Sequence, residues 1–112
     1  MVKPGYVPAQ GDVVWLDFNP QQGHEQRGRR PALVMSHKEY NDKVGLALFC
    51  PITSRVKGYP FEVEAKAAKV TGVVLSDQVK SLDWKARSIE FIEQIEPDIF
   101  VEVKSKLLLL IE

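Results

Sequence analysis

The sequence lacks the residues on which several small-protein architectures depend. A single cysteine, Cys50, stands among 112 residues, so no disulfide can form within the chain. The two histidines and this cysteine together fall short of the four ligands that a structural zinc site requires. A disulfide scaffold and a structural zinc module are therefore excluded.

Long apolar runs and export signals are also absent. The run from Leu107 to Ile111 is only five residues long, whereas a helix that spans a bilayer needs about 20 apolar residues in succession. The first 20 residues contain neither a basic region followed by an apolar stretch nor a small-residue cleavage site. We therefore expect a cytoplasmic protein without a membrane span.

The chain has no excess of charge of one sign, because 15 basic and 15 acidic side chains cancel. The distribution along the chain is uneven. Residues 27–57 carry seven basic and two acidic side chains, whereas residues 88–112 carry two basic and six acidic ones. A basic middle is typical of a face that holds an anionic ligand, but it also fits charges that are simply solvated.

The composition that remains is that of one globular domain. Hydrophobic residues make up 45% of the chain and charged residues 27%, which suffices for a single core. We find no repeat, linker or low-complexity segment. The sequence therefore predicts one domain over residues 1–112.

Short apolar segments separated by glycine and proline predict a fold rich in strands. Residues 12–18 mix β-branched and aromatic side chains, begin after Gly11 and end at Asn19 and Pro20. Further strands are expected over residues 30–35, 46–51, 61–64, 73–76 and 88–92, and a helical turn over residues 37–45. Without β-α-β alternation, this pattern predicts a mostly β (α+β) fold in which an antiparallel sheet curls into a small barrel.

The C-terminal segment has a different pattern and predicts a helix of about four turns. Pro97 suits the first helical position, and Glu102 with Lys106 forms an i,i+4 pair. The residues that line one side are Ile99, Val103, Leu107 and Leu110. Because other apolar residues extend beyond this side, the helix end either lies deep in its own core or is shared with a second copy. We favour the homodimer.

One polar connection, residues 19–29, is dense in donors and titratable groups. Within seven positions the sequence contains His24, Glu25, Gln26, Arg27, Arg29 and Arg30. Glycines within the connection allow tight folding, so that side chains from both ends can converge on one ligand. Loops of this kind often form a site, although a solvated loop without function would have the same composition.

Two further polar clusters follow apolar strands. The first contains Thr53, Ser54, Arg55 and Lys57. Its hydroxyls and cations suit phosphates, and the nearby Tyr59 and Phe61 suit stacking on an unpaired base. The second, Asp77 with Gln78, can read base edges or simply hydrogen-bond its own loop. We find no phosphate-binding glycine loop, dinucleotide fingerprint or nucleophile elbow.

Five blocks occur in order along the chain. They are GD (11–12) before Trp15, GHEQRGRRP (23–31), PITS (51–54), KGYPFEV (57–63), and DQVKS (77–81) with WKAR (84–87). In this order and spacing they resemble the MazF/PemK family of bacterial toxins, which act as endoribonucleases on messenger RNA. The resemblance implies a small SH3-like barrel, a homodimer, sequence-specific cleavage of single-stranded RNA without a metal or other cofactor, and neutralisation by a cognate acidic antitoxin.

The resemblance also implies roles for individual residues. Arg30 matches the catalytic arginine of the family and Thr53 its catalytic threonine. His24 and Asp77 match positions implicated in catalysis or RNA contact in the PemK-like branch. Leu75 stands where that branch has an arginine, which places the chain nearer the MazF branch.

The chemistry of RNA cleavage supports these roles in part. Attack by the 2′-OH on the adjacent phosphate leaves a 2′,3′-cyclic phosphate and a 5′-OH, and donors such as Arg30 and Thr53 suit the developing charge. Arginine has a pKa above about 12 and is a poor base, so we interpret His24 as the candidate general base, with Glu25 behind it. A loop histidine bonded only to backbone is the alternative. The residues expected to bind RNA are Glu25, Gln26, Arg27, Arg29, Ser54, Arg55, Lys57, Asp77 and Gln78.

Two other functions remain open at this stage. A non-catalytic toxin of the same barrel type could poison a topoisomerase such as DNA gyrase, and fold similarity alone does not separate the two activities. An RNA-binding module without catalysis is the third hypothesis. The enzyme requires Arg30 and Thr53, whereas a gyrase poison does not.

Overall fold

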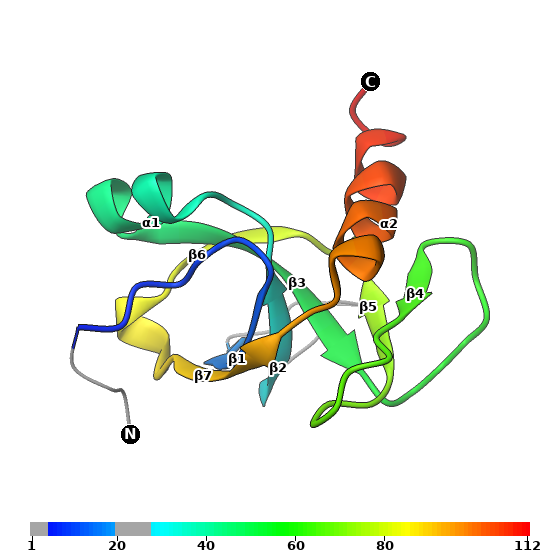
Figure 1. The fold of residues 1–112 in the computed structure, drawn as a ribbon, viewed down its shortest axis with the longest axis horizontal. Coiled ribbons are helices and arrows are strands. Elements are labelled where there is room, and N and C mark those ends of the chain that lie inside the picture. The colour runs from blue at the N-terminus through cyan, green and yellow to red at the C-terminus, as the bar shows by residue number, and fades with distance from the viewer. Residues whose placement is uncertain (1–4, 20–27) are drawn as a thin grey trace.

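The computed structural model describes residues 5–19 and 28–112 (Figure 1). Its strands are β1 (Asp12–Asp17), β2 (Arg29–Val34), β3 (Leu46–Thr53), β4 (Glu62–Glu64), β5 (Val73–Leu75), β6 (Lys80–Asp83) and β7 (Glu90–Gln94). Its helices are α1 (Lys38–Val44), the 3-10 turn η1 (Lys85–Arg87) and α2 (Pro97–Leu108). All strand pairs in these ranges are antiparallel.

The sheet is organised around β3, the longest strand. The order of the paired strands is β4-β5-β3-β2-β1-β7, and β6 pairs with β3 outside this path. The first half of β3 pairs with β6, whereas its last residues pair with β5. The predicted fold class, mostly β with an antiparallel sheet and a C-terminal helix, is confirmed.

The core consists of two clusters on opposite faces of the central strands. Leu33 and Cys50 belong to one cluster, whereas their neighbours Val34 and Phe49 belong to the other. This alternation follows from the period of two along a strand. Helix α2 covers the first cluster and Trp84 contributes to the second. Both faces of β2 and β3 are therefore buried, which explains their nearly continuous apolar sequence.

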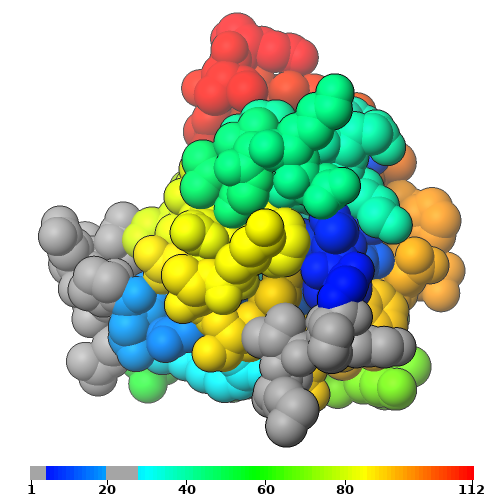
Figure 2. Space-filling view, turned by 90° about the vertical axis from the view of Figure 1, so that its left-hand side faces the viewer, coloured from blue at the N-terminus to red at the C-terminus, as the bar shows by residue number. Residues whose placement is uncertain are grey.

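Helix α1 is fixed to the rest of the molecule through Asn41, which is fully buried. Its side-chain nitrogen donates to the carbonyls of Pro8 at 2.8 Å and Ser36 at 3.1 Å. Its backbone carbonyl accepts from the indole nitrogen of Trp84 at 3.1 Å. Figure 2 shows the result, with α1 lying against the N-terminal residues and the β6–η1 region.

Helix α2 begins at Pro97 as predicted, but its buried side is shorter than expected. Ile99 and Val103 are buried and Leu107 packs against the first cluster, whereas Leu110 lies beyond the helix and is 49% exposed. Leu109 and Ile111 are 73% and 72% exposed. The alternative that the helix end lies deep in its own core is therefore wrong. The end protrudes from the body because the core beneath α2 stops at Leu107 (Figures 1 and 2).

All six predicted strands are present with ends shifted by at most two residues, but β6 and η1 were not predicted. In β6 only Leu82 packs on the core and the other positions are polar, so its strand conformation depends on pairing with β3. Strand β7 begins at Glu90 because Ser88 adopts a φ of 53°, which ends η1 and cannot continue into a strand.

The described residues, 5–19 and 28–112, contain neither a membrane-spanning helix nor a cluster of metal ligands. No helix in these ranges has the length and apolar composition needed to cross a membrane. No three His, Cys, Asp or Glu side chains in the same ranges are grouped as they would be around a metal ion. Cys50 is buried, and burial, assisted by the charge of Asp77, raises its thiol pKa to about 12. This thiol is therefore not a reactive nucleophile at neutral pH.

Candidate functional site

Arg30 and Thr53 lie at the same end of two paired strands. Strands β2 and β3 are antiparallel neighbours, with Ala32 opposite Pro51. This is the last pair at that end, and two residues beyond it lie Arg30, near the start of β2, and Thr53, the last residue of β3. The two predicted catalytic residues, which are 23 positions apart in the sequence, therefore come to the same end of the β2–β3 pair.

Thr53 is more deeply placed than the sequence predicted. It was expected just after the strand, but it is the last residue of β3 and only 8% exposed. Its Oγ1 accepts a hydrogen bond from the backbone N–H of Arg55 at 3.1 Å. A hydroxyl that accepts one bond still has its O–H to donate. Thr53 is thus held in place with one donor available for a ligand.

The position of Thr53 depends on the close approach of Gly72. A Cβ at Gly72 would lie 2.3 Å from the Thr53 carbonyl oxygen, and Gly72 has a φ of +123°. Both features require glycine. Gly72 immediately precedes β5, whose first residue, Val73, pairs with Thr53. The pairing of β3 with β5 therefore fixes the backbone of Thr53.

The adjacent arginines Arg29 and Arg30 have different environments. The Arg29 guanidinium donates to the Ser88 carbonyl at 2.6 Å and to the Glu90 carboxylate at 3.0 Å, so it ties β2 to β7. Arg30 is half-buried, and burial lowers the pKa of its guanidinium. Because arginine ionises far above neutral pH, Arg30 stays charged. The charge of Arg30 thus suits a phosphate, and Arg29 links β2 to the residues at the start of β7.

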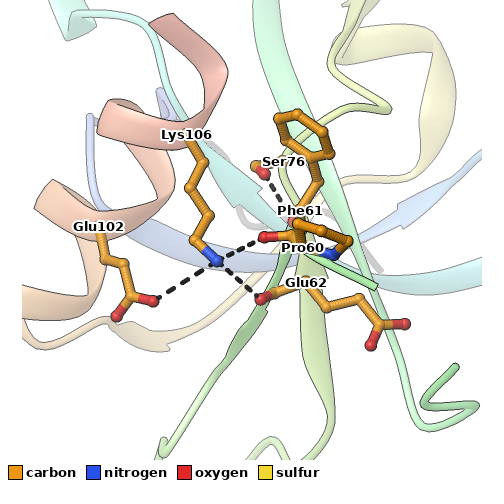
Figure 3. A network of polar contacts seen from close by, with 6 residues as sticks. All are labelled: Pro60, Phe61, Glu62, Ser76, Glu102 and Lys106. Atoms are coloured by element: carbon orange, nitrogen blue, oxygen red, sulfur yellow. Dashed lines mark hydrogen bonds and ion pairs between the residues drawn. The ribbon is translucent and has the colours of Figure 1, made fainter. Parts of the chain in front are cut away.

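The segment after β3, residues 54–61, carries exposed cations, and its backbone is held by hydrogen bonds with Glu62 and Lys106. Ser54, Arg55 and Lys57 are exposed. The Glu62 carboxylate accepts from the backbone N–H groups of Lys57 at 2.9 Å and Gly58 at 2.8 Å. The Lys106 ammonium donates to the backbone carbonyls of Pro60 and of Glu62, the first residue of β4 (Figure 3). Side chains that were predicted to bind phosphate therefore stand on an ordered turn.

Asp77 and Gln78 follow the last residue of β5, at the end of this strand away from the Thr53–Val73 pair. The Tyr59 hydroxyl donates to the Asp77 carboxylate at 2.7 Å. Burial, together with this bond and the Asp77 charge, raises the pKa of Tyr59. Asp77 and Gln78 also line a hollow in the surface, together with Val79 and Lys80. The Tyr59–Asp77 bond thus links Asp77 to segment 54–61, which carries Arg55 and Lys57.

The remaining predicted residues, His24, Glu25, Gln26 and Arg27, lie outside the described residues. The two ends of their connection are described. The Phe18 N–H donates to the Gly28 carbonyl and the Gly28 N–H to the Asn19 side chain, both at 3.0 Å. His24 as a general base stays a prediction.

Two residues that support the site, Arg87 and Lys106, had no predicted role in it. Arg87 donates to the carbonyls of Asp17 at 3.1 Å and Asn19 at 2.8 Å, where the connection leaves β1. Lys106 was expected only as the partner of Glu102, which lies 3.9 Å away. Arg87 is the last residue of the WKAR block (84–87), so the family resemblance already pointed to it. Lys106 had no comparable signal, because its acceptors are backbone atoms.

Comparison with known proteins identifies the family of the chain. Residues 9–111 match the model of the PemK-like, MazF-like toxin family of type II toxin–antitoxin systems. The chain belongs to this family. It is 45% identical over 106 residues to the endoribonuclease toxin MazF of Escherichia coli, covering 95% of this chain and 96% of that protein. The endoribonuclease PemK of Escherichia coli is 31% identical over 102 residues, covering 87% and 77%.

Solved structures give the same assignment. A crystal structure of MazF from Deinococcus radiodurans is 53% identical and superposes with a TM-score of 0.91, covering 95% of this chain and 97% of that one. A MazE–MazF structure from the same organism is 48% identical with a TM-score of 0.83, covering 95% and 96%. The predicted family, and the greater similarity to MazF than to PemK, are confirmed.

Proposed function

We propose that this chain, the toxin of a type II toxin–antitoxin system, is an endoribonuclease that cleaves single-stranded messenger RNA with Arg30 and Thr53 at the scissile phosphate. The observation that carries the proposal is the placement of these two donors at one end of the β2–β3 pair. Similarity to endoribonuclease toxins over nearly the whole chain supports an enzyme. It gives no support to a gyrase poison.

The reaction that fits these residues uses the RNA as its own nucleophile. The 2′-OH attacks the adjacent phosphorus, the P–O bond to the 5′ oxygen of the next nucleotide breaks, and a 2′,3′-cyclic phosphate and a 5′-OH result. Arg30 and the Thr53 hydroxyl donate to the non-bridging oxygens as their charge grows. A preorganised donor of this type is worth about 2.7–4 kcal/mol. The route requires no metal ion.

The proton of the 2′-OH requires a base, and His24 is the proposed one. The ordinary pKa of a histidine, about 6.5, allows a neutral imidazole at physiological pH. Glu25 and Asp77 are the alternatives. The Asp77 carboxylate already accepts the Tyr59 hydroxyl, which favours a binding role for Asp77 instead.

The proposed partners follow from charge and apolar exposure. An acidic antitoxin segment suits the basic residues 27–57, and related structures contain MazE together with MazF. The exposed Leu109 and Ile111 suit a second copy of the chain, so we propose a homodimer through the end of α2. We place the protein in the cytoplasm, where messenger RNA is found.

Cleavage of a labelled RNA in EDTA tests the proposed reaction. Purified protein is incubated with a mixed-sequence single-stranded RNA, and the product ends are identified by mass. We expect a 2′,3′-cyclic phosphate and a 5′-OH from the wild type and intact RNA from Arg30→Ala. Intact RNA with the wild type contradicts the proposal. If the RNA is intact but shifted in a gel, the chain only binds RNA, and if gyrase is trapped on DNA, the chain is a gyrase poison.

The pH dependence of single-turnover cleavage tests the base. If His24 accepts the proton, the rate rises with pH through about 6.5, because only neutral imidazole can accept it. His24→Ala then removes that limb and costs about 10²–10⁴ in rate. A parallel profile in His24→Ala, with a small loss at every pH, contradicts the histidine base. Circular dichroism at both ends of the pH range checks folding.

A further inference from the structure

Lys106 connects α2 to the segment that carries the proposed RNA contacts. Its ammonium donates to the backbone carbonyl of Pro60 and, at 3.5 Å, to that of Glu62 (Figure 3). These acceptors lie 46 and 44 positions earlier in the sequence. The side chain is 28% exposed, so it is largely enclosed by the contact. Helix α2 is therefore fastened to the chain just before and within β4.

Glu62, whose carbonyl accepts from Lys106, also forms hydrogen bonds to the exposed part of segment 54–61. The Glu62 side chain accepts from the N–H groups of Lys57 and Gly58. The Phe61 carbonyl, between the two acceptors of Lys106, accepts from the Ser76 hydroxyl at 2.6 Å. A continuous set of hydrogen bonds thus runs from Lys106 to the backbone of Lys57.

The acceptors distinguish this lysine from an ordinary surface ion pair. Glu102 lies 3.9 Å from Lys106 and is 53% exposed, and such pairs contribute little. Bonds from an ammonium to backbone carbonyls are charge-assisted and shorter. They act on a stretch whose residues 54–58 are all exposed and thus have little packing of their own.

We propose that Lys106 is a positioning residue for RNA binding. By holding Pro60 and Glu62, it keeps segment 54–61 in the conformation that presents Arg55 and Lys57 to the RNA backbone. An ordered segment loses less conformational freedom on binding, so it binds more tightly. The inference rests on the proposed endoribonuclease function and extends it to a residue of α2.

Three variants separate positioning from general stability. Lys106→Met keeps the length of the side chain and removes its donors. Lys104→Met makes the same change of charge at an exposed position of the same helix and is the matched control. Lys106→Arg restores a charged donor. We expect Lys106→Met to raise KM for a short RNA roughly five- to tenfold with kcat nearly unchanged, Lys104→Met to match the wild type, and Lys106→Arg to recover most of the loss.

Hydrogen exchange measures the same effect without RNA. In Lys106→Met the amides of Lys57 and Gly58 should exchange several-fold faster, while those of Leu33 and Cys50 in the core stay unchanged. If these two amides exchange at the wild-type rate, the inference is overturned whether or not the protein cleaves RNA. A fall in kcat with an unchanged KM also overturns it, since that pattern means loss of folded enzyme. If the wild type fails to cleave RNA while exchange responds, the proposed function fails instead.

Discussion

Two regions of the molecule, segment 54–61 and residues 109–112, expose side chains of opposite character: the first is charged and the second is apolar. Segment 54–61 exposes cations, and two of its backbone N–H groups, those of Lys57 and Gly58, are bonded to the Glu62 carboxylate. Beyond α2, residues 109–112 follow the helix in turns and expose Leu109 and Ile111. The first region is costly to bury without an anion, whereas the second is costly to leave in water. The difference indicates two kinds of partner, a polyanion for the segment and an apolar protein surface for the helix end.

The largest effect is expected at Thr53, which directly precedes segment 54–61 and supplies its hydroxyl to the proposed site. Thr53→Val keeps the shape of the side chain and removes the donor. Single-turnover cleavage should fall by about 10²–10³, the cost of one lost donor to a developing oxyanion. Thr71→Val, at an exposed position, is the control. Wild-type cleavage by Thr53→Val would remove Thr53 from the site.

The apolar region is tested by charging it. The double variant Leu109→Asp with Ile111→Asp should convert a dimer into a monomer, because two exposed aliphatic side chains lose their burial, which weakens association by roughly 100-fold. Light scattering at micromolar concentration gives the molar mass. Val44→Asp, on the exposed side of α1, is the control. An equal mass for wild type and double variant contradicts a dimer through the helix end.

The polar region is tested in the same way by reversing its charge. Arg55→Glu or Lys57→Glu should weaken binding of a single-stranded RNA several-fold, because phosphate contacts release condensed counterions. The slope of log affinity against log salt should also fall by about 0.7 per lost contact. Lys38→Glu, on α1, is the matched control. An unchanged slope in the segment variants would place the RNA elsewhere.

The smallest effect is expected at the hydrogen bond from Tyr59, in segment 54–61, to Asp77. Tyr59→Phe removes the donor to Asp77 and should lower the free energy of unfolding by about 1 kcal/mol in urea at pH 7. Tyr40→Phe, on α1, is the control. Because the folded state raises the pKa of Tyr59, this stabilisation is present below the ordinary value of about 10 and is lost at higher pH. A difference between wild type and Tyr59→Phe that grows above pH 10 would contradict this assignment.

Local sequence patterns predicted much of the fold because they report on local physics. The apolar runs around Val34 and Phe49, and Pro97 at a helix start, depend on neighbours in the chain. The pattern failed at β6, whose polar residues form a strand only because β3 offers an edge. It also placed Thr53 outside β3, since the partner that extends this strand, Val73, is remote in sequence.

The sequence by itself determined the residue types of the site, the family resemblance and the strand-rich domain, since these depend on which residues are present and in what order. Only the tertiary structure decided that Arg30 and Thr53 lie at the same end of two paired strands, that Arg29 is engaged with Glu90, and that Lys106 ties α2 to the backbone just before β4. Each of these brings distant parts of the chain together. A strand register and a bond to a backbone carbonyl leave no mark on residue composition, because every residue carries the same carbonyl group.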